Sequence, residues 1–341
     1  MDIKNTLRQL TAETGVSGCE NGAARLALSL LREYAPGAEI DRCGNVIGVI
    51  KSHRPGAKTL MLDAHIDQIG MIVTDIDKDG FIKAGLCGGA DMRILLAQSV
   101  TVHGSQQVRG VVSTLPPHVS SDHSKVPEIG DISIDVGMSR EQAEKVVSPG
   151  DLITVDSAFR ELCGDVVSAP SVDDRSGVCA ILAALDMLRT CELNYDLAIC
   201  FSAQEETGER GVKGAAFRLE PNEAIAVDVS FGRTPDSVPH ETAELGSGVM
   251  IGVSAALDRG MTSRLKQTAQ RCGIPHTTEV MPSSTGTNAD SIAVSHGGVK
   301  CCTLSIPIRY MHTPIEAVMI SDIESTARLI CEYAAGGESN E

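Results

Sequence analysis

The spacing of apolar residues predicts an alternation of helices and strands at both ends of the chain. Helical patterns cover residues 3–13, 20–34, 175–190, 259–272, 288–296 and 321–335. Apolar runs that are typical of buried strands cover residues 59–67, 196–203, 224–230, 277–281 and 299–305. Strands that alternate with helices form a mostly parallel central sheet with helices on both faces. The sequence therefore predicts an α/β fold.

Residues 68–162 follow a different pattern. Short strand-like runs are separated by turn signals such as Lys78-Asp79-Gly80 and Pro116-Pro117, and only residues 140–146 look helical. This pattern predicts a small β-barrel-like (PDZ-like) domain inserted into the α/β domain. The α/β domain would then be discontinuous, with residues 1–67 and 163–341.

Composition narrows the classes of function. The chain has 341 residues and a formal net charge of -16, without a Lys/Arg run, which argues against nucleic acids and anionic membranes as partners. The eleven cysteines show no C-x-x-C spacing and are expected to be reduced. The first residues lack a signal-peptide pattern, and no run approaches the roughly 20 apolar residues of a membrane span. We therefore expect a cytoplasmic protein.

Two of the predicted strands end in pairs of side chains that can bind metals. His65 and Asp67 close the run 59–67, and their i, i+2 spacing puts both on one face of an extended chain. Asp67 can thus hold the second ring nitrogen of His65. Glu205 and Glu206 follow the run 196–203, where a buried carboxylate needs a partner or a metal. Taken alone, His65 is equally compatible with an exposed strand end.

Three more residues fit the same chemistry, although each has a structural explanation. Asp173 precedes a helix, where Asp173 and Asp174 can act as caps. Asp228 lies within an apolar strand and can bond to backbone amides, and a lone histidine such as His312 is often structural. The carboxyl ends of parallel strands converge at one edge, so all these residues would share one cleft. Carboxylates and imidazoles without thiolates suit Zn, Co or Mn.

Six ordered motifs resemble those of a known family. They are AHIDQIG at 64–70, SVDDRSG at 171–177, QEETGERG at 204–211, VDVS at 227–230, TGTNAD at 285–290 and RYMHTP at 309–314. In order and spacing they resemble the tetrahedral dinuclear metallo-aminopeptidases, which include glutamyl, leucyl and lysyl aminopeptidases and members labelled endoglucanase. The resemblance covers essentially the whole chain.

The resemblance implies two divalent ions per subunit, with zinc foremost and cobalt or manganese as alternatives. Asp173 would bridge the ions, His65 and Asp228 would complete one site, and Glu206 and His312 would complete the other. Glu205 would be the general base, and Asp67 would orient His65. The Asp173-Asp174 peptide bond would be cis.

The resemblance also implies an activity and an assembly. The protein would remove N-terminal residues from short peptides, and its inserted domain would mediate dimerisation within a hollow tetrahedral dodecamer. His118 and His123 lie in a loop of the insert that in relatives approaches a neighbouring active site, or they belong to an ordinary exposed loop. Gln68 departs from the Glu that many members carry. An aromatic content of 3% without Trp argues against binding of sugars.

Two alternatives remain at this point. A related dinuclear deacylase or carboxypeptidase would share the same ligands, and a catalytically silent oligomeric scaffold would share the fold. The presence of Glu205 argues against the scaffold, because metal binding alone does not need it. The preferred N-terminal residue is also open. A preference for acidic residues would need a cation in the pocket, and the candidates are Arg233, Arg259, Arg264 and Arg309.

Overall fold

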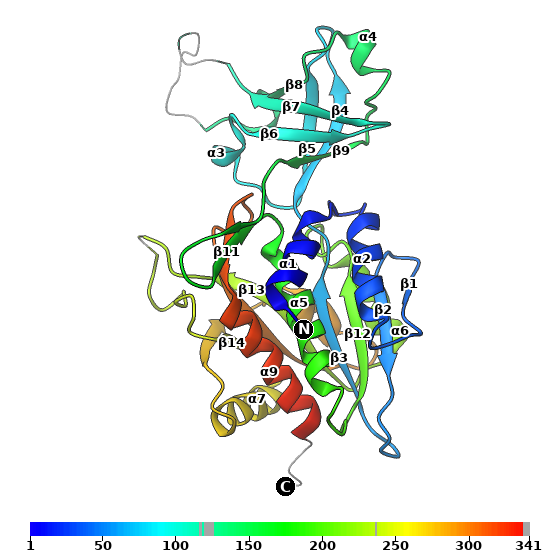
Figure 1. Ribbon diagram of the computed structural model, residues 1–341, viewed down its shortest axis with the longest axis vertical. Helices are drawn as coiled ribbons and strands as arrows, with labels where there is room; N and C mark the ends of the chain where they lie inside the picture. Colours follow the sequence, from blue (N-terminus) through cyan, green and yellow to red (C-terminus); the bar gives the residue numbers. More distant parts are fainter. Residues whose placement is uncertain (116–117, 119–125, 236, 337–341) are drawn as a thin grey trace.

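The protein consists of a sheet covered by helices and a separate small barrel. A computed structural model describes residues 1–115, 118, 126–235 and 237–336. The barrel and the sheet are stacked along the long axis of the molecule, and the first and last described helices, α1 (Ile3–Ala12) and α9 (Ile320–Gly336), belong to the sheet body (Figure 1).

Four parallel strands form the centre of the eleven-stranded sheet. In spatial order they are β12 (Asp196–Ser202), β3 (Thr59–His65), β13 (Glu223–Phe231) and β16 (Lys300–Arg309). Nearly every residue of these strands is buried, as expected for strands covered on both faces. These are the continuous apolar runs of the sequence, so the α/β class is confirmed.

The outer strands of the sheet pair mainly in the antiparallel sense. On one side of the parallel centre lie β2 (Val46–Ile50) and β1 (Glu39–Ile40). On the other side lie β17 (Glu316–Met319), β11 (Val166–Ala169) and β10 (Arg160–Glu161). β14 (Val249–Ser254) also pairs with β16, and β15 (His276–Met281) runs parallel to β14. The parallel arrangement predicted from the sequence thus holds for the centre of the sheet.

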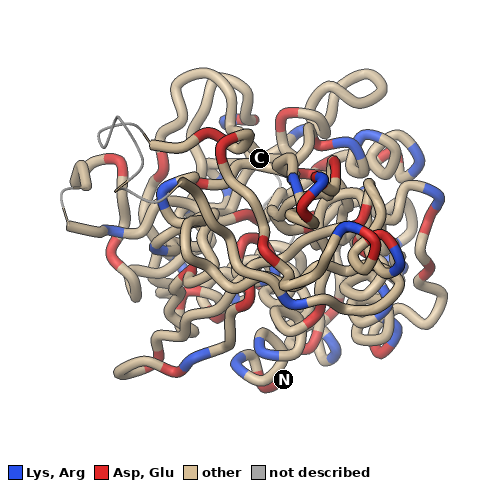
Figure 2. Tube along the Cα trace, turned by 90° about the horizontal axis from the view of Figure 1, so that it is seen from above, with Lys and Arg blue, Asp and Glu red and all other residues tan. Residues whose placement is uncertain are grey.

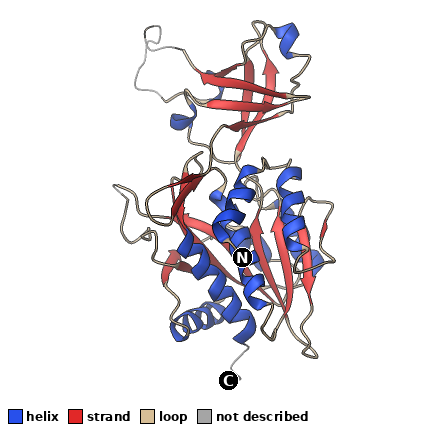
Figure 3. Cartoon of the chain, in the orientation of Figure 1, coloured by secondary structure: helices blue, strands red, loops and turns tan. Residues whose placement is uncertain are grey.

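Helices cover both faces of the sheet, as predicted (Figure 3). The larger apolar core includes residues of α1 (Ile3–Ala12), α2 (Asn21–Leu31), α5 (Val172–Leu188), α7 (Arg259–Arg271) and α9 (Ile320–Gly336). The smaller core on the other face includes residues of α6 (Arg210–Leu219) and α8 (Asn288–Ala293). Each fully buried leucine or phenylalanine of these cores contributes about 1.5–3 kcal/mol relative to an exposed side chain. The helices therefore fix the strand ends on which the functional residues lie.

The barrel is closed by six strands, and every neighbouring pair is antiparallel. They are β4 (Gly70–Ile76), β5 (Ile82–Cys87), β8 (Ser133–Asp135), β7 (Gln107–Ser113), β6 (Ser99–His103) and β9 (Leu152–Val155), in spatial order. Its interior has a core of its own, with Met71, Val100 and Ile153 almost fully buried. The predicted small β-barrel is confirmed.

Two short helices belong to the barrel. The sequence predicted a helix over 140–146, and the structure has α4 (Arg140–Ala143) there. The helix α3 (Met92–Leu95) was not predicted, because four residues are too few to show a helical period.

The barrel is inserted between two segments of the sheet body. β3 ends at His65 and β4 begins at Gly70, and the chain returns from β9 through β10 and β11 to α5 (Figure 1). The division at residues 68 and 162, and a role of the barrel in assembly, remain predictions.

Charge and hydropathy add two observations. Figure 2 shows acidic and basic positions mixed over the described chain. Within the same residues, no helix combines the length and the apolar character that a membrane crossing requires.

Candidate metal centre

The predicted site residues lie at one edge of the sheet. His65 is the last residue of β3, Glu205 and Glu206 follow β12, and His312 follows β16. Asp228 lies within β13, and Asp173 lies at the start of α5. The four central strands are parallel, so their carboxyl ends bring the strand residues together, as expected for an open α/β sheet, and Asp173 joins them from the start of α5.

Asp173 stands between two histidines. Its Oδ1 lies 2.9 Å from Nε2 of His65, and its Oδ2 lies 3.3 Å from Nε2 of His312. The nitrogen of His65 is also 3.9 Å from Oδ1 of Asp228, and that of His312 is 3.5 Å from Oε1 of Glu206. Two groups of potential ligands therefore meet at Asp173.

Each group has the composition and spacing of a metal site. The donor atoms of His65, Asp173 and Asp228 all lie within 4.8 Å of one another, and so do those of Asp173, Glu206 and His312. Oxygen and imidazole nitrogen donors suit divalent cations such as zinc, cobalt or manganese. The residues present thus fit two cations that share the carboxylate of Asp173.

Burial shifts the proton affinities of the cluster. Burial and nearby carboxylates raise the pKa of Glu205 to about 7 and that of Glu206 to about 8. Burial likewise raises the pKa of Asp228 well above its usual value. Burial alone would raise the pKa of Asp173 too, but hydrogen bonds from His312 and His65 hold it below its usual value. Crowded, buried carboxyl groups of this kind favour the binding of cations.

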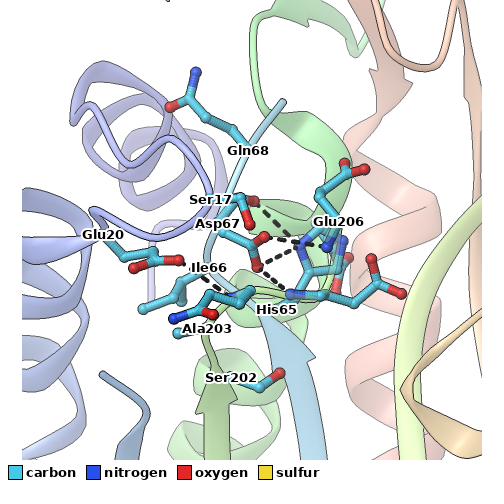
Figure 4. A network of polar contacts seen from close by, with 12 residues as sticks. Ser17, Glu20, His65, Ile66, Asp67, Gln68, Ser202, Ala203 and Glu206 are labelled. Atoms are coloured by element: carbon cyan, nitrogen blue, oxygen red, sulfur yellow. Dashed lines mark hydrogen bonds and ion pairs between the residues drawn. The ribbon is translucent and has the colours of Figure 1, made fainter. Parts of the chain in front are cut away.

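Asp67 fixes the loop that carries Glu205 and Glu206. Its carboxylate is fully buried and accepts the backbone N–H of Glu205 at 2.9 Å and that of Glu206 at 3.1 Å. Nδ1 of His65 lies 3.1 Å from the backbone oxygen of Asp67 and 3.5 Å from its carboxylate. Asp67 thus lies between His65 and Glu206 (Figure 4). The shorter contact with His65 is made by the main-chain oxygen, whereas the sequence hypothesis named the side chain.

Glu316 binds the backbone of two other residues of the cluster in a similar way and was not singled out from the sequence. Its carboxylate accepts the backbone N–H of Asp173 at 3.1 Å and that of His312 at 2.8 Å. The residue is 2% exposed. The available signal was an acidic residue four positions after His312, at the start of the apolar run EAVM.

Gln68 contacts a buried arginine. Its Oε1 accepts the backbone N–H of Gly15 at 3.1 Å and a guanidinium N–H of Arg175 at 3.2 Å. In Figure 4 its side chain is directed away from Asp67 and Glu206. Gln68 therefore contacts Arg175 and lines the cavity that Asp173, Glu206 and His312 also border.

Three further expectations concern residues near the ligands or in the insert. The Asp173-Asp174 peptide bond is cis, as the resemblance implies. Asp174 is fully buried and accepts the backbone N–H of Gly177 at 2.9 Å, outside both ligand groups. His118 is exposed, and His123 lies outside the described residues.

Comparisons with known proteins identify the family of the chain. A family model described as M42 glutamyl aminopeptidase matches residues 44–329. A lysyl aminopeptidase of Pyrococcus furiosus is 33% identical over 330 residues, which cover 95% of this chain and 94% of the relative. The structure of an aminopeptidase from the archaeon Desulfurococcus kamchatkensis superposes with a TM-score of 0.93 at 32% sequence identity. The match covers 98% of this chain and 95% of the aminopeptidase chain.

A further solved structure links the chain to the TET peptidases. The TET1 peptidase of Pyrococcus horikoshii, described as able to assemble into a tetrahedron or a large octahedral shell, has a TM-score of 0.86 at 29% identity. The match covers 98% of this chain and 99% of that one. With the family model over most of its length and these relatives, the chain belongs to the M42 glutamyl aminopeptidase family of peptidases.

Proposed function

We propose that this chain is a metal-dependent aminopeptidase that removes N-terminal residues from short peptides. Two divalent ions, with zinc foremost and cobalt or manganese as alternatives, would be held by His65, Asp173, Glu206, Asp228 and His312. The observation that carries the proposal is the carboxylate of Asp173, which belongs to both ligand groups at the carboxyl edge of the sheet. Membership of an aminopeptidase family favours this activity over a deacylase or carboxypeptidase.

The residues of the site then have distinct roles in hydrolysis. When bound, the two ions would supply Lewis-acid activation of a water molecule and of the scissile carbonyl. Glu205 lines the cavity beside the ligands and would accept the proton of the attacking water, then donate it to the leaving amine. Asp67 and Glu316 would keep the ligands in place through the backbone N–H groups that they bind.

We further propose that the insert, residues 68–162, forms dimers and that dimers build a dodecamer in the cytoplasm. The support is what is described for similar proteins: PhTET1-12s is described as a dodecamer, and the TET1 peptidase of Pyrococcus horikoshii as able to assemble into a tetrahedron or a large octahedral shell. A closed shell would admit short peptides and exclude folded proteins. Light scattering coupled to gel filtration tests the assembly, and a stable monomer would contradict it.

A panel of aminoacyl-nitroanilides tests the activity. The protein is stripped with a chelator and then assayed with zinc, cobalt or manganese. Release of nitroaniline that depends on the added ion is the expected result. If no member of the panel is cleaved with any ion, the aminopeptidase proposal fails and a silent scaffold becomes the better explanation.

A further inference from the structure

Two cavities border the candidate metal centre, and they differ in chemistry. The smaller one, of about 50 Å³, lies towards the barrel and is lined largely by apolar residues such as Ile69, Met71 and Leu95. The larger one, of about 430 Å³, contains Asp173, Glu205 and Asp228 together with Glu279. Glu279 is the acidic residue of this cavity that belongs to neither ligand group nor to the proposed proton transfer.

Glu279 is held in place by two hydroxyl groups. It lies on β15 in register with Gly252 of β14, and it reaches across that strand to β16. Ser305 on β16 donates a hydrogen bond of 2.6 Å to its carboxylate, and Ser230 on β13 donates another. Ser230 and Ser305 are almost fully buried. Glu279 forms no ion pair within the described part of the chain. Its carboxylate is bound by the two uncharged serine hydroxyls.

The position of Glu279 relative to the ligands follows from the strand register. Ser305 is the register partner of Asp228, and Ser230 lies two residues after Asp228 on the same face of β13. Two residues along a strand span about 6.6 Å. The partners of Glu279 therefore flank a predicted metal ligand, about one side-chain length from it. Met281, Met311 and Phe231 also line the cavity and offer apolar surface.

The cavities are lined by His312, and the larger one also by His65, but both histidines belong to the predicted ligand groups. The described residues that border them include neither Lys nor Arg. Three of the arginines that might serve an acidic substrate have other contacts: Arg233 pairs with Glu244 at 2.8 Å, Arg264 pairs with Glu223 at 2.7 Å, and Arg309 donates to the backbone oxygen of Arg233 at 2.6 Å. Arg259 borders a different pocket.

The charge balance of the larger cavity also favours a cationic ligand. Two divalent cations would be neutralised by Asp173, Asp228, Glu206 and Glu205. Glu279 then leaves the cavity with a surplus negative charge. A buried carboxylate without a basic partner is costly, and burial raises the pKa of Glu279. A cationic side chain entering the cavity would supply the missing charge.

We propose that Glu279 binds the charged end of a lysine or arginine at the N-terminus of the substrate, so that the enzyme prefers peptides with basic first residues. The methylene stem of such a side chain fits between the apolar residues of the cavity, and its cation meets a carboxylate that two serines orient. This inference rests on the proposed aminopeptidase function and specifies its substrate.

Kinetics with the metal-loaded enzyme test the preference. Lysyl, arginyl, leucyl and glutamyl nitroanilides are compared for wild type and for Glu279→Gln, which keeps the size of the side chain and removes its charge. We expect kcat/KM for the lysyl and arginyl substrates to fall about 10- to 100-fold, because a hydrogen bond to a charged group is lost. The leucyl rate should be unchanged. Glu324→Gln, the same change at an exposed position of α9, is the matched control and should alter none of the rates.

A binding measurement that does not depend on turnover accompanies the kinetics. L-lysinol and L-norleucinol differ in the charge of the side chain and lack a scissile carbonyl. By calorimetry, lysinol should bind wild type more tightly than norleucinol, and Glu279→Gln should abolish the difference.

The outcomes separate this inference from the proposed function. If leucyl or glutamyl substrates are cleaved at least as fast as lysyl and arginyl ones, the function stands and the role of Glu279 is wrong. If Glu279→Gln lowers all rates equally, Glu279 is structural and the inference also fails. If no substrate is cleaved, the proposed function itself fails, and a lysinol preference lost in Glu279→Gln would still support a cation pocket.

Discussion

Asp67 and Glu316 hold different parts of the candidate metal centre in the same manner. Each buried carboxylate accepts two backbone N–H groups, with distances of 2.9 and 3.1 Å at Asp67 and of 3.1 and 2.8 Å at Glu316. Asp67 binds amides 138 and 139 residues further along the chain. Glu316 binds one amide four residues before it and another in α5. The side chains of the cluster are therefore positioned through their own backbone.

Replacing Glu316 by Gln should weaken the centre. The amide keeps one acceptor and turns an NH2 group towards a backbone N–H, so one of the two hydrogen bonds is lost. Losses of this kind cost about 10- to 100-fold in metal affinity or activity. Metal titration and kcat measure the effect, with Glu324→Gln as the control. If both variants behave alike, Glu316 does not position the ligands.

Replacing Glu205 by Gln should separate catalysis from metal binding. Glu205 belongs to neither ligand group, so the metal content measured by mass spectrometry should stay at the wild-type level. Turnover should fall at least about 10²-fold, because general bases contribute about 10²–10⁴. A variant with normal turnover would exclude Glu205 as the base.

Replacing Asp173 by Ala should remove both ions together. Its two carboxylate oxygens face different histidines, at 2.9 Å and 3.3 Å, so neither group keeps three protein ligands without it. Asp228→Ala serves as the comparison, because it affects only the group that contains His65. Metal content after gel filtration measures the loss. One tightly bound ion retained in the Asp173 variant would argue against a shared carboxylate.

The metal-free protein should lose stability as the pH rises from about 6 to about 9. Burial raises the pKa of Glu205 to about 7 and of Glu206 to about 8, and the hydrogen bond to Asp173 raises that of His312 to about 9. Across this interval the folded state binds more protons than the unfolded state, so its free energy of unfolding falls with increasing pH.

Added cations should reverse this dependence. They replace the protons of the cluster, so metal binding should tighten as the pH rises and release protons. Thermal unfolding of chelated and metal-loaded protein at several pH values measures both effects. An unfolding midpoint of the chelated protein that does not change with pH would contradict the titration of these groups.

The centre of the fold could be predicted from the sequence, because its strands are apolar over their whole length. The helix α6 and the strand β14 were not predicted, because their sequences favour a helix or a strand less strongly. α6 (Arg210–Leu219) contains Gly211 and Gly214, which lower its intrinsic preference for a helix, and β14 (Val249–Ser254) contains Gly252, which lowers the preference for a strand. These elements form because packing in the folded chain outweighs their local preferences.

The proximity of these residues was expected for a different reason. Parallel strands end at one edge of a sheet, so polar residues at those ends come close together, whereas the part of Asp173, at the start of a helix, was inferred from the family resemblance. The role of Glu316 could not be found in this way, because it depends on one side chain reaching the amides of two separate segments. The same limit applies to Gln68, whose contact with Arg175 joins distant parts of the chain.

The spread of the cluster along the chain also bears on how the protein is made. His65 lies near the start of the sequence and His312 near its end, with the whole barrel between His65 and Asp173. A ribosome has therefore synthesised almost all of the chain before the second group of ligands is complete. Nascent fragments would bind metal poorly, and the gain in stability that tight metal binding brings would come only to finished molecules.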